Sequence, residues 1–193
     1  MNILNWLAEN FDLPILEWIA DNLQCNFLDT VMPYVTALGN GGIFWIALAV
    51  VLIFFAEHRK AGLSMGAALL MGLVLCNLLL KPLVARMRPY DYQWEYFGVS
   101  IDLLLAPPHD YSFPSGHTIA SFEAATALLL HNRKFGIPAM ILAVLVAFSR
   151  LYLYVHYPTD VIASIILGVG LAFLGTWLVK KGYGLYEAKK AKK

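Results

Sequence analysis

Two long stretches without a charged side chain dominate the first half of the sequence. The first runs for 26 residues from Val31 to Ala56, and the second runs for 20 residues from Ala61 to Leu80. Because an α-helix rises about 1.5 Å per residue, each stretch is long enough to cross a hydrocarbon core of roughly 30 Å. These stretches therefore predict membrane-spanning helices.

Three further apolar stretches follow in the second half. One is interrupted by Glu123, and another carries Arg150 near its end. Hydrophobic residues make up 60% of the chain and charged residues 14%, against about 45–50% and 25% in soluble domains. This composition excludes an ordinary soluble enzyme, a disordered chain and a nucleic-acid-binding domain. We expect an all-α, polytopic membrane helix bundle with five spans, at residues 31–56, 61–80, 115–130, 135–155 and 161–179.

The first thirty residues have a different pattern. Apolar and aromatic side chains alternate there with the carboxylates of Glu9, Asp12, Glu17 and Asp21. This amphipathic pattern favours a helix that lies in the membrane interface, while a sixth span is the alternative, with costly carboxylates in lipid. We therefore divide the chain into an N-terminal amphipathic segment (1–30), a catalytic helical bundle (31–181) and a Lys-rich tail (182–193), all within a single membrane-embedded domain.

The distribution of Lys and Arg predicts the orientation of the bundle. Ten of the 14 basic residues fall in two turns and the tail, which alternating spans place on one side of the membrane. Cytoplasmic loops carry an excess of Lys and Arg, so this side should be cytoplasmic. The other four basic residues fall near the opposite, extracytoplasmic face and need another explanation: Lys81, Arg86, Arg88 and Arg150.

Three polar clusters should converge on the extracytoplasmic face, because successive helices alternate in direction. They are residues 81–89, 113–117 and 149–160. Lys81, Arg88 and Arg150 supply cationic donors, and arginine matches phosphate oxygens with two parallel hydrogen bonds. Ser115 and Gly116 precede a helix, whose N-terminal amides form an anion site. The clusters thus predict a site for a phosphate group.

Two histidines and an aspartate complete this set. Imidazole titrates near neutral pH, so His117 and His156 can act as nucleophile and proton donor. Pro158 fits the first turn of a helix, which would place Asp160 in the opening turn of the last span. From there Asp160 could hold one ring nitrogen of His156 and leave the other free to attack. The chemistry indicated is phosphoryl transfer.

These residues resemble the three signatures of the type-2 phosphatidic acid phosphatase superfamily, which contains membrane lipid phosphatases and vanadium-dependent haloperoxidases. Eleven positions match in order and spacing. They are Lys81, Arg88 and Pro89, then Pro114, Ser115, Gly116 and His117, and finally Ser149, Arg150, His156 and Asp160.

The resemblance implies a role for each matching residue. His156 would attack phosphorus and form a phosphohistidine, with Asp160 orienting it, and His117 would protonate the leaving oxygen and then activate water. The phosphate-binding residues would be Lys81, Arg88, Ser115, Gly116 and Arg150, with Ser149 in a supporting hydrogen bond. Phosphatases of this family need no metal, so the resemblance implies neither a metal nor another cofactor.

Several polar residues near these clusters have open roles. For Arg86, contact with the substrate phosphate and contact with lipid headgroups are equally consistent with the sequence. His109 and Asp110 precede the second cluster, and loop packing is the favoured interpretation for both. Glu123 lies six residues beyond His117, where it could form an interhelical hydrogen bond or line the substrate route.

The function expected is that of a membrane lipid phosphatase whose partners are its lipid substrate and the bilayer, without nucleic acid; the oligomeric state is open. The small size, short loops and extracytoplasmic site resemble bacterial members that convert undecaprenyl diphosphate to undecaprenyl phosphate in the cell membrane. Phosphatidylglycerophosphate or phosphatidic acid is the alternative substrate. A lipid or anion transporter that uses the same cations is the alternative from another class of protein.

Overall fold

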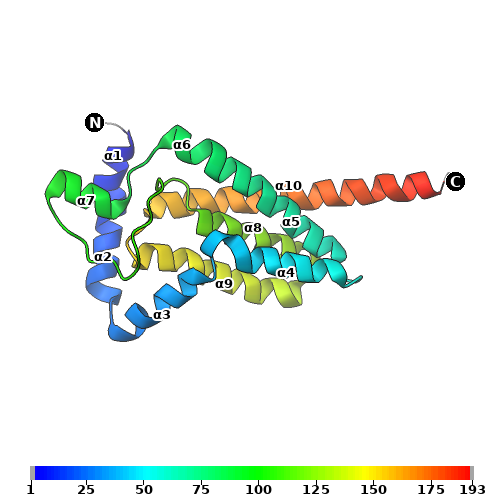
Figure 1. The fold of residues 1–193 in the computed structure, drawn as a ribbon, viewed down its shortest axis with the longest axis horizontal. Coiled ribbons are helices and arrows are strands. Elements are labelled where there is room, and N and C mark those ends of the chain that lie inside the picture. Colours follow the sequence, from blue (N-terminus) through cyan, green and yellow to red (C-terminus); the bar gives the residue numbers. More distant parts are fainter. Residues whose placement is uncertain (1–2, 192–193) are drawn as a thin grey trace.

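The structure is a computed structural model that describes residues 3–191, and it is all-helical over this range (Figure 1). The N-terminal half contains α1 (Ile3–Leu7), the π-helical η1 (Ala8–Asp12), α2 (Leu13–Leu23), α3 (Asn26–Ala37), the 3₁₀ turn η2 (Asn40–Gly42), α4 (Ile43–Phe54), α5 (Arg59–Leu73), the π-helical η3 (Val74–Leu80) and α6 (Lys81–Val84). The rest contains α7 (Pro89–Phe97), α8 (Gly116–His131), α9 (Arg133–Tyr152) and α10 (Pro158–Lys190).

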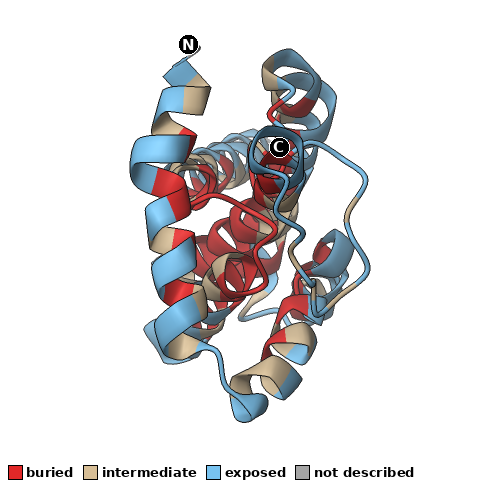
Figure 2. Cartoon of the chain, turned by 90° about the vertical axis from the view of Figure 1, so that its left-hand side faces the viewer, coloured by how far each residue is buried: buried red, intermediate tan, exposed pale blue. Residues whose placement is uncertain are grey.

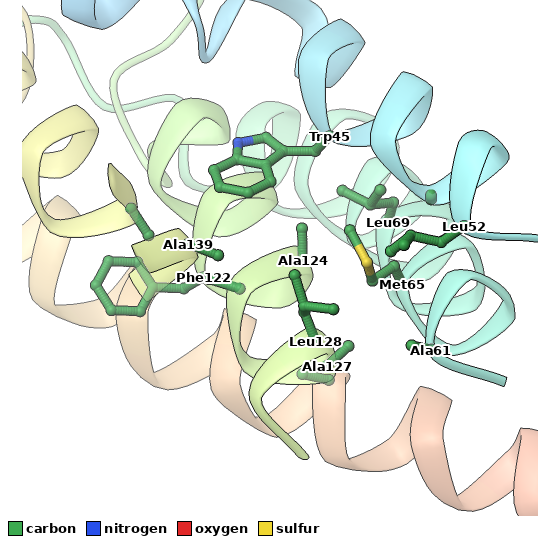
Figure 3. Close-up of a cluster of buried hydrophobic side chains, with 14 of the residues drawn as sticks. Trp45, Leu52, Ala61, Met65, Leu69, Phe122, Ala124, Ala127, Leu128 and Ala139 are labelled. Carbon is green, nitrogen blue, oxygen red and sulfur yellow. The ribbon is translucent and has the colours of Figure 1, made fainter. Parts of the chain in front are cut away.

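Helix α8 lies at the centre of the bundle, against α5, α9 and α10, and α4 packs on α5. The inward positions of α8 carry small side chains, including Ala124 and Ala127, which are fully buried. Trp45 of α4 and Met65 of α5 fill the space beside them (Figure 3). Small residues allow helix backbones to approach closely in a bundle, and this packing fixes the position at which α8 begins.

The expected span at residues 31–56 is broken in the structure. Helix α3 ends at Ala37 and α4 begins at Ile43, with a bend of 40° between them. Gly41 and Gly42 adopt positive φ angles of 58° and 66° at the break, a backbone conformation that glycine adopts without steric cost. The prediction of one uninterrupted helix was therefore wrong, and the break lies beside the candidate site.

Within residues 3–191, three helical segments are long and apolar enough to cross a membrane. They are Arg59–Phe97, which begins with α5, and the helices α9 and α10. The bent pair α3–α4 makes a fourth if it is counted as one span. Helix α8 has only 16 residues and contains Glu123. The all-helical membrane bundle is confirmed, whereas the count of five spans stays a prediction.

Helix α10 extends well beyond the other helices toward the C-terminus (Figure 1). It runs for 33 residues, from Pro158 to Lys190, and so includes most of the segment expected as a separate Lys-rich tail. Lys192 and Lys193 of that tail lie outside the described residues.

The N-terminal helix, formed by α1, η1 and α2, crosses the ends of the bundle helices (Figure 1). Its buried residues face the bundle, whereas the opposite side is exposed (Figure 2). Leu13 and Leu16 pack on Tyr154 and Tyr157, and Trp18 is among the exposed residues. This orientation favours the interfacial interpretation of residues 1–30 over a sixth span.

Gly136→Ala should lower the melting temperature of the detergent-purified protein. A Cβ at this position of α9 would lie 2.2 Å from Cα of Leu129 in α8, and overpacking of this kind costs about 1–3 kcal/mol. The matched control is Gly170→Ala in α10, where a Cβ meets nothing within 4 Å; it should melt at or slightly above the wild-type temperature. Equal melting temperatures for the two variants would contradict the close packing of α8 on α9.

Candidate active site

The three polar clusters meet at one end of the bundle, where they line a cavity of about 800 Å³. Lys81 and Arg88 come from the chain around α6, Gly116 and His117 from the start of α8, Arg150 from the end of α9, and His156 from the turn before α10. The structure thus brings together six of the eight residues predicted for the site. The other two, Ser115 and Asp160, lie directly behind them and are fully buried.

Prolines and a serine cap position these residues. Pro89 and Pro158 occupy the first turns of α7 and α10, where a missing N–H costs nothing. Arg88 and His156 therefore lie in extended or turn segments at the helix starts. Ser115 is the N-cap of α8, and its hydroxyl accepts a hydrogen bond from the Thr118 hydroxyl at 2.9 Å. The Ser115 side chain thus shapes the helix end, and the next residue, Gly116, lines the cavity.

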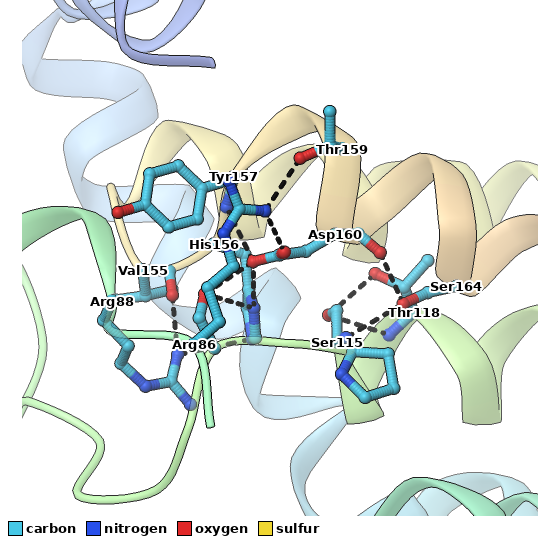
Figure 4. Close-up of polar contacts among 12 residues, drawn as sticks. Arg86, Arg88, Ser115, Thr118, Val155, His156, Tyr157, Thr159, Asp160 and Ser164 are labelled. Carbon is cyan, nitrogen blue, oxygen red and sulfur yellow. Dashed lines mark hydrogen bonds and ion pairs between the residues drawn. The ribbon is translucent and has the colours of Figure 1, made fainter. Parts of the chain in front are cut away.

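His156 is buried between an acidic and a basic partner (Figure 4). Its Nδ1 lies 3.6 Å from Oδ2 of Asp160, which is longer than a hydrogen bond. The Ser112 hydroxyl donates to the same Oδ2 at 2.5 Å and lies 3.5 Å from Nδ1. On the other side of the ring, Nε2 is 3.3 Å from Nη1 of Arg88. The ring therefore presents Nε2 to the cations and Nδ1 to the carboxylate.

Burial lowers the pKa of His156 well below its usual range, and the positive charges of Arg88, Arg150 and Lys81 lower it further. A lowered pKa keeps the imidazole neutral at physiological pH, so that one ring nitrogen retains a free electron pair. A neutral histidine in a cationic pocket is suited to attack an anionic phosphorus centre.

Two of the cations are paired with a loop carboxylate. Asp110 forms ion pairs with Lys81 and with Nη2 of Arg88, and its backbone carbonyl accepts from Nε of Arg88 at 2.7 Å. Although partial burial raises the pKa of Asp110, the contacts with Lys81 and Arg88 hold it well below its usual range. Asp110 thus lines the cavity and attaches its loop to two of the cations, and its expected loop-packing role stays a prediction.

The third cation, Arg150, has a different environment. It is buried, its Nη1 donates to the Thr36 hydroxyl at 2.6 Å, and its Nε has no hydrogen-bond partner among residues 3–191. Arg150 also lines the cavity, and a guanidinium there can form charge-assisted hydrogen bonds with an oxyanion.

Sequence reasoning missed three side chains of this site: Ser112, Thr36 and Asn40. Ser112 bonds Asp160, Thr36 bonds Arg150, and Oδ1 of Asn40 lies 2.8 Å from Nε2 of His117. Thr36 lies in the last turn of α3, and Asn40 lies in the break between α3 and α4. The run Gly39-Asn40-Gly41-Gly42 is the sequence signal that could have indicated an irregular segment there.

The residues with open roles are also placed. Arg86 does not line the main cavity but borders the smaller one, and it pairs with two buried carboxylates, from Asp12 and Asp160, an arrangement that the sequence did not suggest. Glu123 is buried and lines the cavity, and its Oε1 has no partner in the described chain. His109 borders a smaller cavity of about 480 Å³ beside Arg88, and the Ser149 hydroxyl bonds the backbone carbonyl of Val146.

Comparison with known proteins adds a family to this geometry. Residues 61–183 match the family model described as the PAP2 superfamily. The chain is 34% identical over 161 residues to an undecaprenyl-diphosphatase of Sulfolobus acidocaldarius, covering 82% of this chain and 74% of the relative. It is 32% identical over 147 residues to the undecaprenyl-diphosphatase BcrC of Bacillus subtilis, covering 76% of this chain and 72% of the relative.

A solved structure has the same arrangement of helices. It is the PAP2-type phosphatidylglycerolphosphate phosphatase of Bacillus subtilis, with a TM-score of 0.70 and 27% identity. The match covers 94% of this chain and 88% of that protein. Together with the apolar helices, these relatives make the chain a multi-pass membrane protein.

Asp110→Asn should tighten the binding of orthovanadate, a phosphate mimic, to the detergent-purified protein by about fivefold. The carboxylate competes with an incoming oxyanion for Lys81 and Arg88, and a partly exposed charge pair of this kind is worth up to about 1 kcal/mol. Calorimetric titration measures the dissociation constant. Asp102→Asn, an exposed aspartate of the same loop, is the control and should bind as the wild type does. Unchanged or weaker binding by Asp110→Asn would show that the carboxylate does not compete.

Proposed function

The chain belongs to the PAP2 superfamily and is a phosphatase of lipid phosphates, and we propose that it removes the terminal phosphate of undecaprenyl diphosphate through a phosphohistidine at His156. The observation that carries the proposal is the placement of His156, with Nε2 beside Arg88 and Nδ1 facing Asp160 within one cation-lined cavity.

The shape of the main cavity supports a lipid substrate. From the cationic end it continues between α4 and α5, where its lining is apolar and includes Ile46, Val50, Ile53 and Leu70. A diphosphate would occupy the cationic end, while the first isoprenoid units would contact the apolar part. This division of polar and apolar lining is what an amphiphilic substrate requires.

In the first step, Nε2 of His156 attacks the terminal phosphorus. A bond forms between this nitrogen and phosphorus, and the bond between phosphorus and the bridging oxygen breaks. The ring gains positive charge as the bond forms, and the Asp160 carboxylate near Nδ1 stabilises that charge. The products of this step are undecaprenyl phosphate and a phosphorylated histidine.

The cations stabilise the transition state of this step. Lys81, Arg88 and Arg150 surround the position where the equatorial oxygens gain charge, and the backbone amide of Gly116 begins α8 beside them. Donors positioned in advance commonly provide the largest single contribution to catalysis, and loss of one costs roughly 2.7–4 kcal/mol. Arg150 lines the cavity and forms no ion pair among the described residues, so an incoming phosphate would balance its charge.

His117 serves as the general acid and then as the general base. It protonates the leaving oxygen in the first step and takes a proton from water in the second, when water attacks the phosphohistidine and releases inorganic phosphate. Asn40 accepts a hydrogen bond from Nε2 of His117 at 2.8 Å and so orients the ring. The proposed reaction uses side chains of this chain alone and needs no metal ion.

The similar undecaprenyl-diphosphatases, which cover most of this chain, support the choice of substrate. The similar solved phosphatase is named for phosphatidylglycerolphosphate, so a glycerophospholipid phosphate is the second candidate. We place the enzyme in the cell membrane with its C-terminus in the cytoplasm. The excess of Lys and Arg at the other end of the bundle supports an extracytoplasmic site.

The purified protein in detergent with EDTA should release phosphate from undecaprenyl diphosphate faster than from phosphatidylglycerophosphate or phosphatidic acid. His156→Ala should lower the rate by about 10³-fold or more, because the nucleophile is lost, while orthovanadate binding remains measurable. A colorimetric phosphate assay measures the rates of phosphate release from each lipid and by the variant. Preference for a glycerophospholipid would favour the second candidate, and wild-type turnover by His156→Ala would contradict the proposed mechanism. Absence of hydrolysis of any of these lipids by the folded protein would favour a transporter.

Asn40→Ala should lower kcat for the preferred lipid by about tenfold and leave KM nearly unchanged. General acid–base catalysis contributes about 10²–10⁴-fold, and a ring that loses its hydrogen-bond partner loses part of that contribution. Steady-state kinetics test this. Asn22→Ala is the matched control, because the Asn22 amide is exposed and donates only to the Trp18 carbonyl of its own helix. Equal kcat values for the two variants would exclude the orienting role of Asn40.

A further inference from the structure

We propose that Asp12 and Arg86 are positioning residues for the reaction: the N-terminal helix, through Asp12 and Arg86, holds the Asp160 carboxylate that orients His156. This inference rests on the proposed function, in which His156 is the nucleophile. It assigns a part in catalysis to a helix that lies outside the family match at residues 61–183.

Arg86 connects the two carboxylates directly. Its Nη1 lies 2.5 Å from Oδ1 of Asp160, and its Nη2 lies 2.7 Å from Oδ2 of Asp12. The Tyr157 ring covers the guanidinium plane at 3.8 Å (Figure 4). The side chain of Arg86 is 5% exposed, and those of both aspartates are 0% exposed. A buried ion pair with such geometry fixes its members, because loss of one partner leaves an uncompensated charge.

Asp12 is also attached to the start of α10. Its Oδ1 accepts a hydrogen bond from the backbone amide of Thr159 at 2.8 Å, and its Oδ2 accepts from the Thr159 hydroxyl at 2.7 Å. Nη1 of Arg86 donates to the same hydroxyl at 2.8 Å. Thr159 immediately precedes Asp160 in the chain. Asp12 therefore holds the backbone next to Asp160, through Thr159, and also holds Arg86, which pairs with the Asp160 carboxylate.

The direction of Arg86 separates it from the phosphate-binding cations. Among the described residues that line the main cavity, Arg88 is present and Arg86 is absent. Ala85, with a φ of 47°, turns the chain after α6, and Arg86 then points toward α10. Arg86 therefore acts on the reaction through Asp160 rather than through the substrate.

The arrangement turns one oxygen of Asp160 toward the histidine. Arg86 binds Oδ1, whereas Oδ2 accepts from Ser112 and from the Tyr157 amide at 3.2 Å and faces Nδ1 of His156. Two carboxylates and one guanidinium leave a net negative charge in the cluster. That charge stabilises the positive ring that forms when His156 binds phosphorus.

The test compares Asp12→Asn and Arg86→Lys with the wild type, using kcat, KM and the inhibition constant for orthovanadate. Asn retains the shape of Asp12 without its charge, and Lys retains the charge of Arg86 without the fork that reaches both carboxylates. Both variants should lose about 10- to 100-fold in kcat, because complete loss of an orienting carboxylate costs up to about 10⁴-fold. KM and the vanadate inhibition constant should stay within about twofold of wild type.

Two controls make the comparison specific. Asp21→Asn, at an exposed position of the same N-terminal helix, should keep wild-type kinetics. Arg88→Lys should raise the vanadate inhibition constant, because Arg88 lines the cavity. In addition, Asp12→Asn combined with Asp160→Asn should be no slower than Asp160→Asn alone, since both act through one carboxylate.

Three results would overturn the inference. The first is a kcat within twofold of wild type for a folded Asp12→Asn variant. The second is a rise in the vanadate inhibition constant of Arg86→Lys as large as that of Arg88→Lys, which would make Arg86 a phosphate ligand. The third is a loss of kcat in the double variant equal to the product of the two single losses.

If Arg86→Lys does not fold, the result for Asp12→Asn decides alone. Wild-type turnover by His156→Ala would instead overturn the proposed function together with this inference, whereas an inactive His156→Ala beside a fully active Asp12→Asn would overturn this inference only.

Discussion

Charged side chains buried at the end of an apolar bundle must find partners, and the way these charges are paired determines the site. Four buried cations lie there: Lys81, Arg86, Arg88 and Arg150. Lys81 and Arg88 pair with Asp110, which is half-exposed on a loop. Arg86 pairs with two fully buried carboxylates. Arg150 has a hydroxyl partner and an unused Nε among the described residues.

This division corresponds to two different tasks. Arg86, whose charge is balanced by two buried carboxylates, stabilises the fold around Asp160. The cations that face the cavity are paired with an exposed carboxylate or incompletely paired, so an incoming phosphate can replace or complete their contacts. The same low-polarity surroundings that make an unpaired charge costly also strengthen its attraction to a phosphate group. All four cations are buried, so the bundle separates structural from substrate-binding charges by how they are paired.

Much of this site follows from sequence because its parts begin or end helices. The spacing of Pro89, Ser115 and Pro158 relative to the apolar stretches predicts where helices begin, and alternation of direction then predicts that the three clusters converge. The contributions of Thr36 and Asn40 could not be predicted, because they depend on how a broken helix packs on α9 and α8. The direction of Arg86 likewise depends on a left-handed residue, Ala85, which sequence patterns do not indicate. Local signals identified the helix ends, whereas partners from distant elements required the tertiary structure.

In the proposed reaction, Nε2 of His156 attacks phosphorus within a cradle formed by Lys81, Arg88 and Arg150. The most direct measurement is an experimental structure of the protein with bound orthovanadate, which mimics the transition state of phosphoryl transfer. We expect a vanadium atom at bonding distance from Nε2 of His156, with its equatorial oxygens on these three cations. A vanadate bound on another side chain, or one held by the cations with His156 out of reach, would contradict the proposed reaction.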